Sequence, residues 1–76
     1  MSKKVERIEI IYSDELIKMR LKKLIGRTGC VIEEVIGKNN NIIGAFIQLD
    51  IPHKEEKEWF IPIKSIMILS NEKTKT

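Results

Sequence analysis

The sequence predicts a mainly β fold: a small barrel of five short strands, with one short helix between the first and second strands. Isoleucine dominates the apolar residues, with fifteen copies against five leucines and three valines. β-branched side chains of this kind fit a pleated sheet better than a helix. Short apolar segments also follow one another closely, separated by glycine, asparagine or proline. Closure into a barrel protects edge strands, which otherwise promote aggregation.

Length and composition limit the chain to one domain. Its 76 residues, 42% of them apolar, suffice for a single core. We place the domain at residues 1–69 and expect residues 70–76, which contain no apolar side chain, to form a disordered tail. No apolar run approaches the roughly 20 residues of a membrane span, and we find no secretion signal. The single cysteine excludes an internal disulfide, which is typical of proteins in a reducing compartment. From these observations together we expect a cytoplasmic protein with no membrane contact.

The first strand is predicted at residues 5–12. Ile8, Ile10 and Tyr12 recur there at every second position, with charged side chains among the residues between them. This alternation is typical of a strand with one buried face.

A helix is predicted after this strand. Ser13 is a suitable N-cap, and the two carboxylates that follow it suit the first turn of a helix. Gly26 suits the C-terminal end. The apolar residues between these ends recur at helical spacing: Ile17, Leu21 and Leu24. The same segment also alternates apolar and basic residues, so a strand remains the alternative for residues 16–25.

Four further strands are predicted at residues 30–36, 42–50, 58–61 and 66–69. Residues 37–41 form the clearest turn, because glycine and asparagine tolerate positive φ. In the strand after this turn, the inward-facing residues are expected to be Ala45, Ile47 and Leu49. Pro62 ends the fourth strand, and residues 63–65 are expected to make one 3₁₀ turn before the last strand.

Two segments resemble a known family. Residues 26–31 read Gly-Arg-Thr-Gly-Cys-Val and resemble the G-x-x-G-x-V core of the KOW motif, found on SH3-like barrels of ribosomal proteins and transcription elongation factors. Residues 59–66 read Trp-Phe-Ile-Pro-Ile-Lys-Ser-Ile and look like the closing segment of many SH3-like barrels. The resemblance implies that the predicted five-stranded barrel is SH3-like. The matching residues, Gly26, Gly29 and Val31, are structural, so the resemblance implies a fold and no activity.

Residues that could carry catalysis are few. His53 is the only histidine, and it falls in a charged segment that we predict to be a loop, residues 52–57. Cys30 is the only cysteine and begins an apolar strand, with no obvious base near it in sequence. No zinc-ligand spacing, P-loop or dinucleotide motif is present in the sequence. We therefore expect no enzymatic activity, no metal and no cofactor.

The formal net charge of +3 is unevenly distributed. Residues 16–32 contain five basic residues and no acidic one, so this segment carries +5 and the remainder −2. A one-sided basic surface binds phosphate backbones by releasing their counterions, although a solvated helix face has the same composition. We expect a small non-enzymatic module that binds RNA or DNA electrostatically through Lys18, Lys22, Lys23, Arg27 and Lys38.

The few aromatic residues suggest an alternative function. Phe46 is expected to face outward on the third strand, and either Trp59 or Phe60 to face outward on the fourth. Neighbouring aromatic side chains offer a platform for nucleic-acid bases, for a protein partner, or for a second copy of the chain. They are core residues instead if the helix covers this face. The alternative is therefore a protein-interaction or self-assembly module, such as an accessory subunit or a phage or mobile-element protein, that uses Phe46, Trp59 and Phe60.

Overall fold

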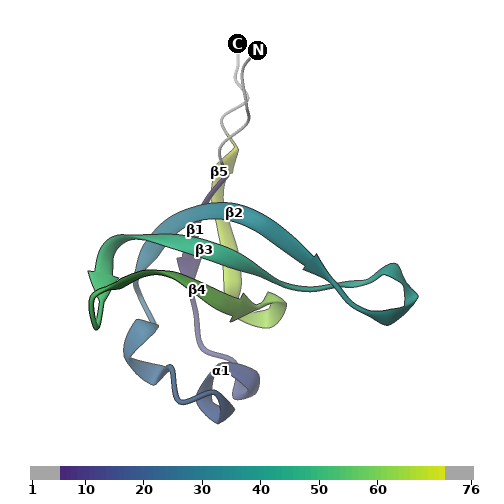
Figure 1. Cartoon of the computed structure of the whole chain (residues 1–76), viewed down its shortest axis with the longest axis horizontal. Coiled ribbons are helices and arrows are strands. Elements are labelled where there is room, and N and C mark those ends of the chain that lie inside the picture. The colour runs from purple at the N-terminus through teal and green to yellow at the C-terminus, as the bar shows by residue number, and fades with distance from the viewer. Residues whose placement is uncertain (1–5, 72–76) are drawn as a thin grey trace.

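The computed structural model describes residues 6–71, and its framework is one antiparallel sheet in the order β4-β3-β2-β1-β5 (Figure 1). The strands are β1 (Glu6–Ile10), β2 (Thr28–Ile36), β3 (Ile42–His53), β4 (Glu56–Pro62) and β5 (Ile66–Asn71). The helical segments are α1 (Asp14–Lys18) and three 3₁₀ turns, η1 (Lys22–Leu24), η2 (Lys38–Asn40) and η3 (Ile63–Ser65). The predicted mainly β fold, with one short helix between the first and second strands, is confirmed.

The predicted closure of the sheet into a barrel is not observed. Within residues 6–71, β4 pairs with β3 and β5 pairs with β1, and the two edge strands do not pair with each other. The chain passes from β4 to β5 through η3, which begins directly after Pro62. The strand-ending proline and the 3₁₀ turn that we predict are therefore both present, but they connect two free edges.

The helical segment begins as predicted and ends early. The hydroxyl of Ser13 accepts a hydrogen bond from the backbone N–H of Leu16 at 3.1 Å, which is the predicted N-cap. Arg20 then takes a left-handed φ of 64°, which an α-helix does not continue through. The single helix predicted as far as Gly26 is therefore divided into α1 and η1, and the strand alternative for residues 16–25 is wrong.

The core lies between the sheet and this helical layer, which covers one face of the sheet (Figure 1). We call the covered face the inner face and the opposite one the outer face. The buried apolar side chains are Ile8, Ile10, Leu16, Leu24, Ala45, Ile47, Leu49 and Ile61. The inward orientation predicted for the third strand is thus confirmed. The apolar face predicted for the helix, which included Ile17, is corrected. Leu16 is buried whereas Ile17 is 37% exposed, because the break at Arg20 means that these residues do not share one continuous helix.

Several boundaries differ from the prediction. β1 ends at Ile10, and Tyr12 is 62% exposed, with its hydroxyl donating to the carboxylate of Asp14 at 2.8 Å. In the turn at residues 37–41, positive φ falls on Asn39 and Asn40. β5 runs through Asn71, so the first two residues of the predicted tail belong to a strand. The rest of that tail lies outside the described residues.

The predicted charged loop is a tight hairpin turn. β3 extends to His53, which pairs with Glu56 at the start of β4. The two residues between them, Lys54 and Glu55, have φ of 55° and 69°, the pattern of a two-residue type I′ turn. None of the helices in the described part of the chain is long and apolar enough to cross a membrane.

Candidate functional site

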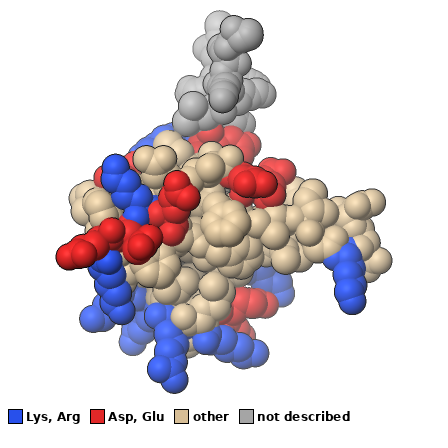
Figure 2. All heavy atoms as spheres, viewed as in Figure 1, with Lys and Arg blue, Asp and Glu red and all other residues tan. Residues whose placement is uncertain are grey.

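A shallow cleft opens between the helical layer and the β3–β4 turn. Its lining side chains are Ile17, Arg20, Lys22, Lys23, His53 and Lys54. Four of these six are lysine or arginine, and no described acidic residue lines the cleft. We call this surface the basic cleft. Figure 2 shows lysine and arginine side chains gathered at the end of the molecule that carries α1 and η1.

Local backbone structure places these cations. The buried side chain of Leu24 anchors η1 in the core. Two backbone hydrogen bonds then tie the following turn to β1: the N–H of Gly26 donates to the carbonyl of Ile10 at 2.7 Å, and the N–H of Ile10 donates to the carbonyl of Arg27 at 2.9 Å. Gly26 has φ of 91°, a conformation that glycine adopts without the strain of a side chain. The basic segment is therefore held against the sheet on both sides of its turn.

His53 forms part of the cleft wall, and its pKa responds to the positive charges around the cleft. Its ring packs against the indole of Trp59, with centroids 5.5 Å apart. Partial burial lowers the pKa of His53, and the positive charges of Arg27, Lys54 and Lys23 lower it further. Three cations from two separate parts of the chain therefore act on one imidazole. This concentration of positive charge is the main electrostatic property of the basic cleft.

Trp59 lies between the ring of His53 and the buried core. Its indole N–H donates to the backbone carbonyl of Glu56 at 3.0 Å, and its side chain packs against the buried core. Because Trp59 is fixed by both contacts, the ring of His53 rests on a rigid surface.

The structure brings some of the predicted nucleic-acid-binding residues together and separates others. Lys22 and Lys23 line the basic cleft, and Arg27 acts on it through His53 while donating to the carbonyl of Ile51 at 3.3 Å. Lys18 is exposed at the end of α1 and does not line the cleft. Lys38 lies in η2, at the tip of the β2–β3 hairpin that projects away from α1 (Figure 1).

Four residues of the cleft were not predicted as site residues: Ile17, which was expected in the core, and Arg20, His53 and Lys54. Arg20 belongs to the basic segment, but on a continuous helix it falls at the margin of the basic face. His53 and Lys54 lie far along the chain and reach the cleft only because β3 and β4 form a hairpin there. The positive φ of Lys54, which makes that hairpin tight, is not recognisable from its flanking sequence.

The aromatic residues divide between the two faces of the sheet. Phe46 and Phe60 are direct cross-strand partners on the outer face, with ring centroids 5.8 Å apart in an edge-to-face arrangement. Phe46 is 40% exposed, so its predicted outward orientation is confirmed. Trp59 alternates with Phe60 along β4 and therefore points to the inner face. The three residues do not form one platform.

The phenylalanine pair lies among acidic residues. Glu33 is the cross-strand partner of Phe46, and Glu58 is the partner of Gln48, two positions further along β3. Figure 2 views this face and shows acidic side chains on both sides of a central uncharged region. Carboxylates repel phosphate, so the outer face is a poor surface for stacking nucleic-acid bases.

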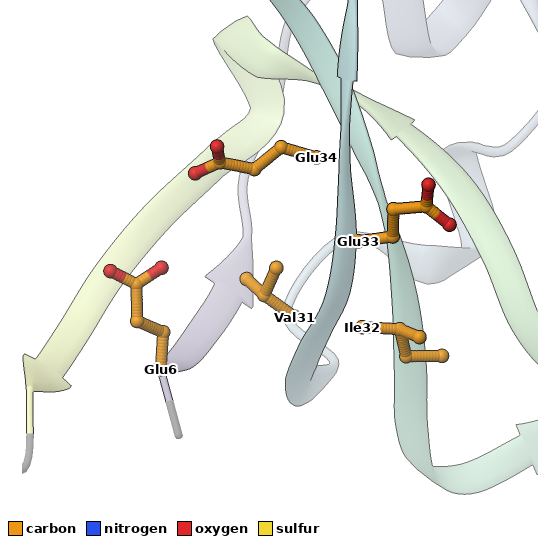
Figure 3. Close-up of a pocket in the computed structure, with 5 residues that line it drawn as sticks. All are labelled: Glu6, Val31, Ile32, Glu33 and Glu34. Atoms are coloured by element: carbon orange, nitrogen blue, oxygen red, sulfur yellow. The ribbon is translucent and has the colours of Figure 1, made fainter. Parts of the chain in front are cut away.

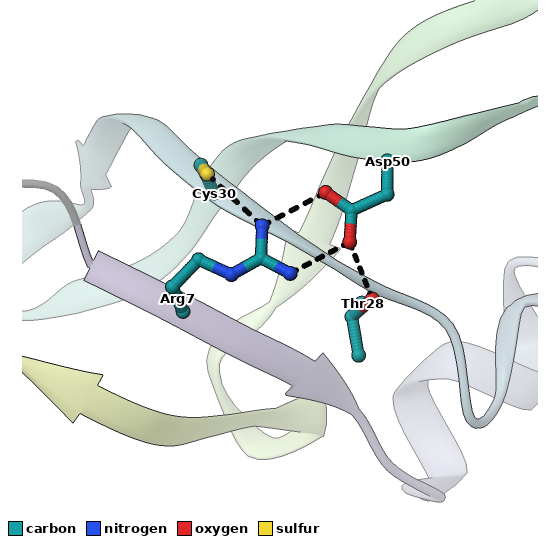
Figure 4. A network of polar contacts seen from close by, with 4 residues as sticks. All are labelled: Arg7, Thr28, Cys30 and Asp50. Atoms are coloured by element: carbon teal, nitrogen blue, oxygen red, sulfur yellow. Dashed lines mark hydrogen bonds and ion pairs between the residues drawn. The ribbon is translucent and has the colours of Figure 1, made fainter.

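A second group of polar side chains on the outer face is structural (Figure 4). The guanidinium of Arg7 donates two hydrogen bonds to the carboxylate of Asp50, at 2.8 and 2.7 Å, and the hydroxyl of Thr28 donates to the same carboxylate at 2.6 Å. The hydrogen bonds from Arg7, then the one from Thr28, hold the pKa of Asp50 well below its usual range. Arg7 also donates to the sulfur of Cys30 at 3.4 Å. This network links β1, β2 and β3 and neutralises its own charges.

Acidic residues also border a hollow beside β2, lined by Glu6, Val31, Ile32, Glu33 and Glu34 (Figure 3). Glu34 and Glu33 point to opposite sides of the strand (Figure 3), as adjacent residues of a strand do. The carboxylates therefore do not converge on one point. Within residues 6–71, no group of three or more His, Cys, Asp or Glu side chains is placed to hold a metal ion.

Comparison of the chain with protein-family models, with curated proteins and with solved structures finds no match. The geometry and charge of the surfaces described above are therefore the basis on which a function can be argued.

Proposed function

We propose that this protein is a non-enzymatic module that binds nucleic acid through the basic cleft. The observation that carries this proposal is the convergence of cations from the helical layer and from the β3–β4 turn on one cleft that no described carboxylate lines. A phosphate backbone neutralises such a surface and releases its counterions, which favours binding at low salt.

The character of the cleft favours binding that tolerates many sequences. Its cations are lysine and arginine side chains around a shallow opening, which suit phosphate contacts. The imidazole of His53 adds a flat surface and a titratable donor beside them. We expect contacts of this kind to fix the path of a backbone without reading bases, on either RNA or DNA.

We further propose that the sheet belongs to the SH3-like barrels, and to their KOW-type members in particular. Two features support this. The 3₁₀ turn η3 lies between β4 and β5 where the resemblance implies one. At Gly29 a Cβ would lie within 2.4 Å of the backbone oxygen of Gln48, so this glycine permits the close approach of β2 and β3.

The nucleic-acid proposal is tested by fluorescence anisotropy with a labelled single-stranded oligonucleotide and a labelled duplex, over a range of salt concentrations. Lys23→Glu is the test variant and Lys38→Glu the matched control, because both reverse the charge of a lysine in a 3₁₀ turn and only Lys23 lines the cleft. We expect Lys23→Glu to weaken binding by roughly tenfold and to reduce the salt slope by about 1 to 2. Lys38→Glu is expected to have a small effect.

Two results would contradict the proposal. One is the absence of binding by the wild-type protein at low salt. The other is an equal loss of affinity in the two lysine variants, which would make the effect one of net charge rather than of the cleft.

The phenylalanine pair supports the second candidate function, a protein-interaction module. Phe46, which is exposed, and Phe60, which is half-buried, form an apolar pair beside Glu33 and Glu58, on the face opposite the helical layer. Phe46→Ser is expected to abolish partner binding while leaving nucleic-acid affinity unchanged. A loss of nucleic-acid affinity in this variant would instead assign the pair to the first function.

A further inference from the structure

The free edge of β5 is apolar and exposed. β1 is its only hydrogen-bonded neighbour in the described part of the chain, so the backbone groups along its other edge have no strand partner there. The strand begins Ile66-Met67-Ile68-Leu69. Met67, Ile68 and Leu69 are 40%, 49% and 46% exposed. Adjacent side chains of a strand point to opposite faces, so apolar surface is exposed on both sides of this edge.

β5 lacks two of the features that usually keep edge strands from pairing, namely charge and proline. Natural proteins protect such edges with charged residues, prolines or very short strands. β5 is six residues long, and the sequence Ile66–Asn71 contains no charged residue and no proline. Its pairing with β1 is regular from Ile66 to Ile68 and shifts register by one residue before Ser70, so the regular part of the edge is the part available for pairing. The other edge, β4, contains Glu56, Lys57 and Glu58 and ends in Pro62. Only one of the two edges is therefore chemically suited to accept another strand.

We propose that two copies of this protein pair through their β5 edges, antiparallel and about a two-fold axis, to form one continuous ten-stranded sheet. In such a pair each strand meets its own sequence in the opposite direction. Because β5 is uncharged, no like charges meet in any register close to its centre. Apolar side chains of one copy then lie beside those of the other on both faces of the sheet.

The distribution of charge favours a second copy as the occupant. The chain carries a net charge of +3, and four of its fourteen lysine and arginine residues line the basic cleft, beside the β3–β4 turn. β4 and β5 are the two outermost strands in the order of the sheet, and no residue of β5 lines the basic cleft. Pairing through β5 therefore uses an uncharged edge and leaves the lining residues of both basic clefts outside the paired strands.

The area available sets the expected stability of this dimer. A stable interface buries at least about 600 Å² on each partner, and smaller ones are transient. The chain exposes 5502 Å² in total, and one strand edge with three half-exposed side chains supplies only part of the area a stable dimer needs. We therefore expect a reversible dimer whose population rises with protein concentration.

The test is sedimentation velocity of the full chain from low to high micromolar concentration. Ile68→Lys is the test variant and Ile36→Lys the matched control, because both isoleucines lie in strands and are 49% and 55% exposed. Ile36 is in β2, near the β2–β3 hairpin and away from β5. We expect the wild type and Ile36→Lys to approach twice the monomer mass, and Ile68→Lys to remain a monomer.

Amide hydrogen exchange on the wild-type protein gives a second reading that does not depend on a variant folding. Protection of β5 amides is expected to increase with concentration, while protection of β4 amides stays constant. A monomer at every concentration, unchanged dimerisation by Ile68→Lys, or protection that rises in β4 would each overturn the proposal. Growth beyond the dimer would also overturn it, because that result indicates head-to-tail pairing of β5 with β4.

Discussion

The two edge strands of the sheet, β4 and β5, both contain apolar residues but differ in where these residues lie and in how much charge accompanies them. Along β4, apolar residues alternate in direction: Ile61 enters the core, and Phe60 lies on the outer face. The remaining positions near its start carry charge. Along β5, three consecutive apolar side chains stay about half exposed. Apolar content alone therefore does not distinguish a protected edge from one that can pair, whereas the placement of charge does.

This difference also separates the two surfaces that we propose to be functional. The basic cleft lies beside the turn that leads into β4, and the apolar edge is β5, at the other end of the sheet. A variant that affects one surface is therefore expected to leave the other unchanged.

The largest expected effect on stability comes from shortening an apolar side chain in an edge strand, and it is expected to differ between β4 and β5. Ile61 is fully buried whereas Ile68 is 49% exposed. Ile61→Ala is expected to lower the free energy of unfolding by about 2–5 kcal/mol because it leaves a cavity, and Ile68→Ala by less than about 1 kcal/mol. Urea denaturation at low protein concentration measures both. Equal losses would mean that β5 contributes to the core as much as β4 does.

The next effect tests how closely β4 packs on β3. A Cβ at Gly44 would lie 2.4 Å from the ring of Phe60 and 2.5 Å from the backbone oxygen of Ile61. Gly44→Ala is therefore expected to destabilise the fold by about 1–3 kcal/mol through overpacking. Gln48→Ala, an exposed position of the same strand, is the control and is expected to change stability by less than about 0.5 kcal/mol. Thermal denaturation that finds the two variants equally stable would contradict this packing.

A smaller effect is expected where the two edges are connected. The hydroxyls of Ser13 and Ser65 are 2.6 Å apart and buried, which joins the N-cap of α1 to η3. Ser65→Ala is expected to destabilise the protein by about 1–2 kcal/mol, because it leaves the hydroxyl of Ser13 with one partner fewer. Lys64→Ala removes only an exposed ion pair with Glu15 and is expected to cost less than about 0.5 kcal/mol. Chemical denaturation in which Lys64→Ala has the larger effect would contradict this assignment.

The smallest expected effect concerns pH and the basic cleft. The pKa of His53 is lowered by burial and by neighbouring cations, so its imidazole is neutral at pH 7. A bound phosphate favours the protonated form, and proton uptake then accompanies binding. Affinity for an oligonucleotide is expected to increase a few-fold between pH 8 and pH 6, and His53→Gln is expected to remove that increase. An equal increase in the His53→Gln variant would exclude His53 as its source.

The same group affects stability with the opposite sign. Because the folded protein binds this proton less tightly than the unfolded chain, the contribution of neutral His53 to stability is complete above the unfolded pKa of 6.5. It is lost as the pH falls through that value towards the lower folded pKa. Denaturation curves without nucleic acid are therefore expected to show a small loss of stability where binding becomes stronger.

Much of the fold could be predicted because its signals are local. The alternation of Ile8 and Ile10, the inward positions of the third strand and the N-cap at Ser13 each depend on neighbouring residues. The predicted helical stripe was wrong at Ile17, whereas Leu24 is buried and Leu21 packs against the core. The left-handed residue Arg20 interrupts the helix, and an arginine in that conformation has no sequence signature. The candidate site could be predicted only in part, because His53 and Lys54 reach it through a hairpin.

The sequence by itself determined five strands, one helix start, a strand-ending proline and a basic segment, since periodicity, capping and charge are properties of adjacent residues. Only the tertiary structure decided which basic residues share a cleft, that Trp59 and the phenylalanine pair lie on opposite faces, and that β4 and β5 both remain free edges. These outcomes depend on contacts between segments distant in sequence. Such contacts follow from the register and twist of the whole sheet, which no single segment encodes.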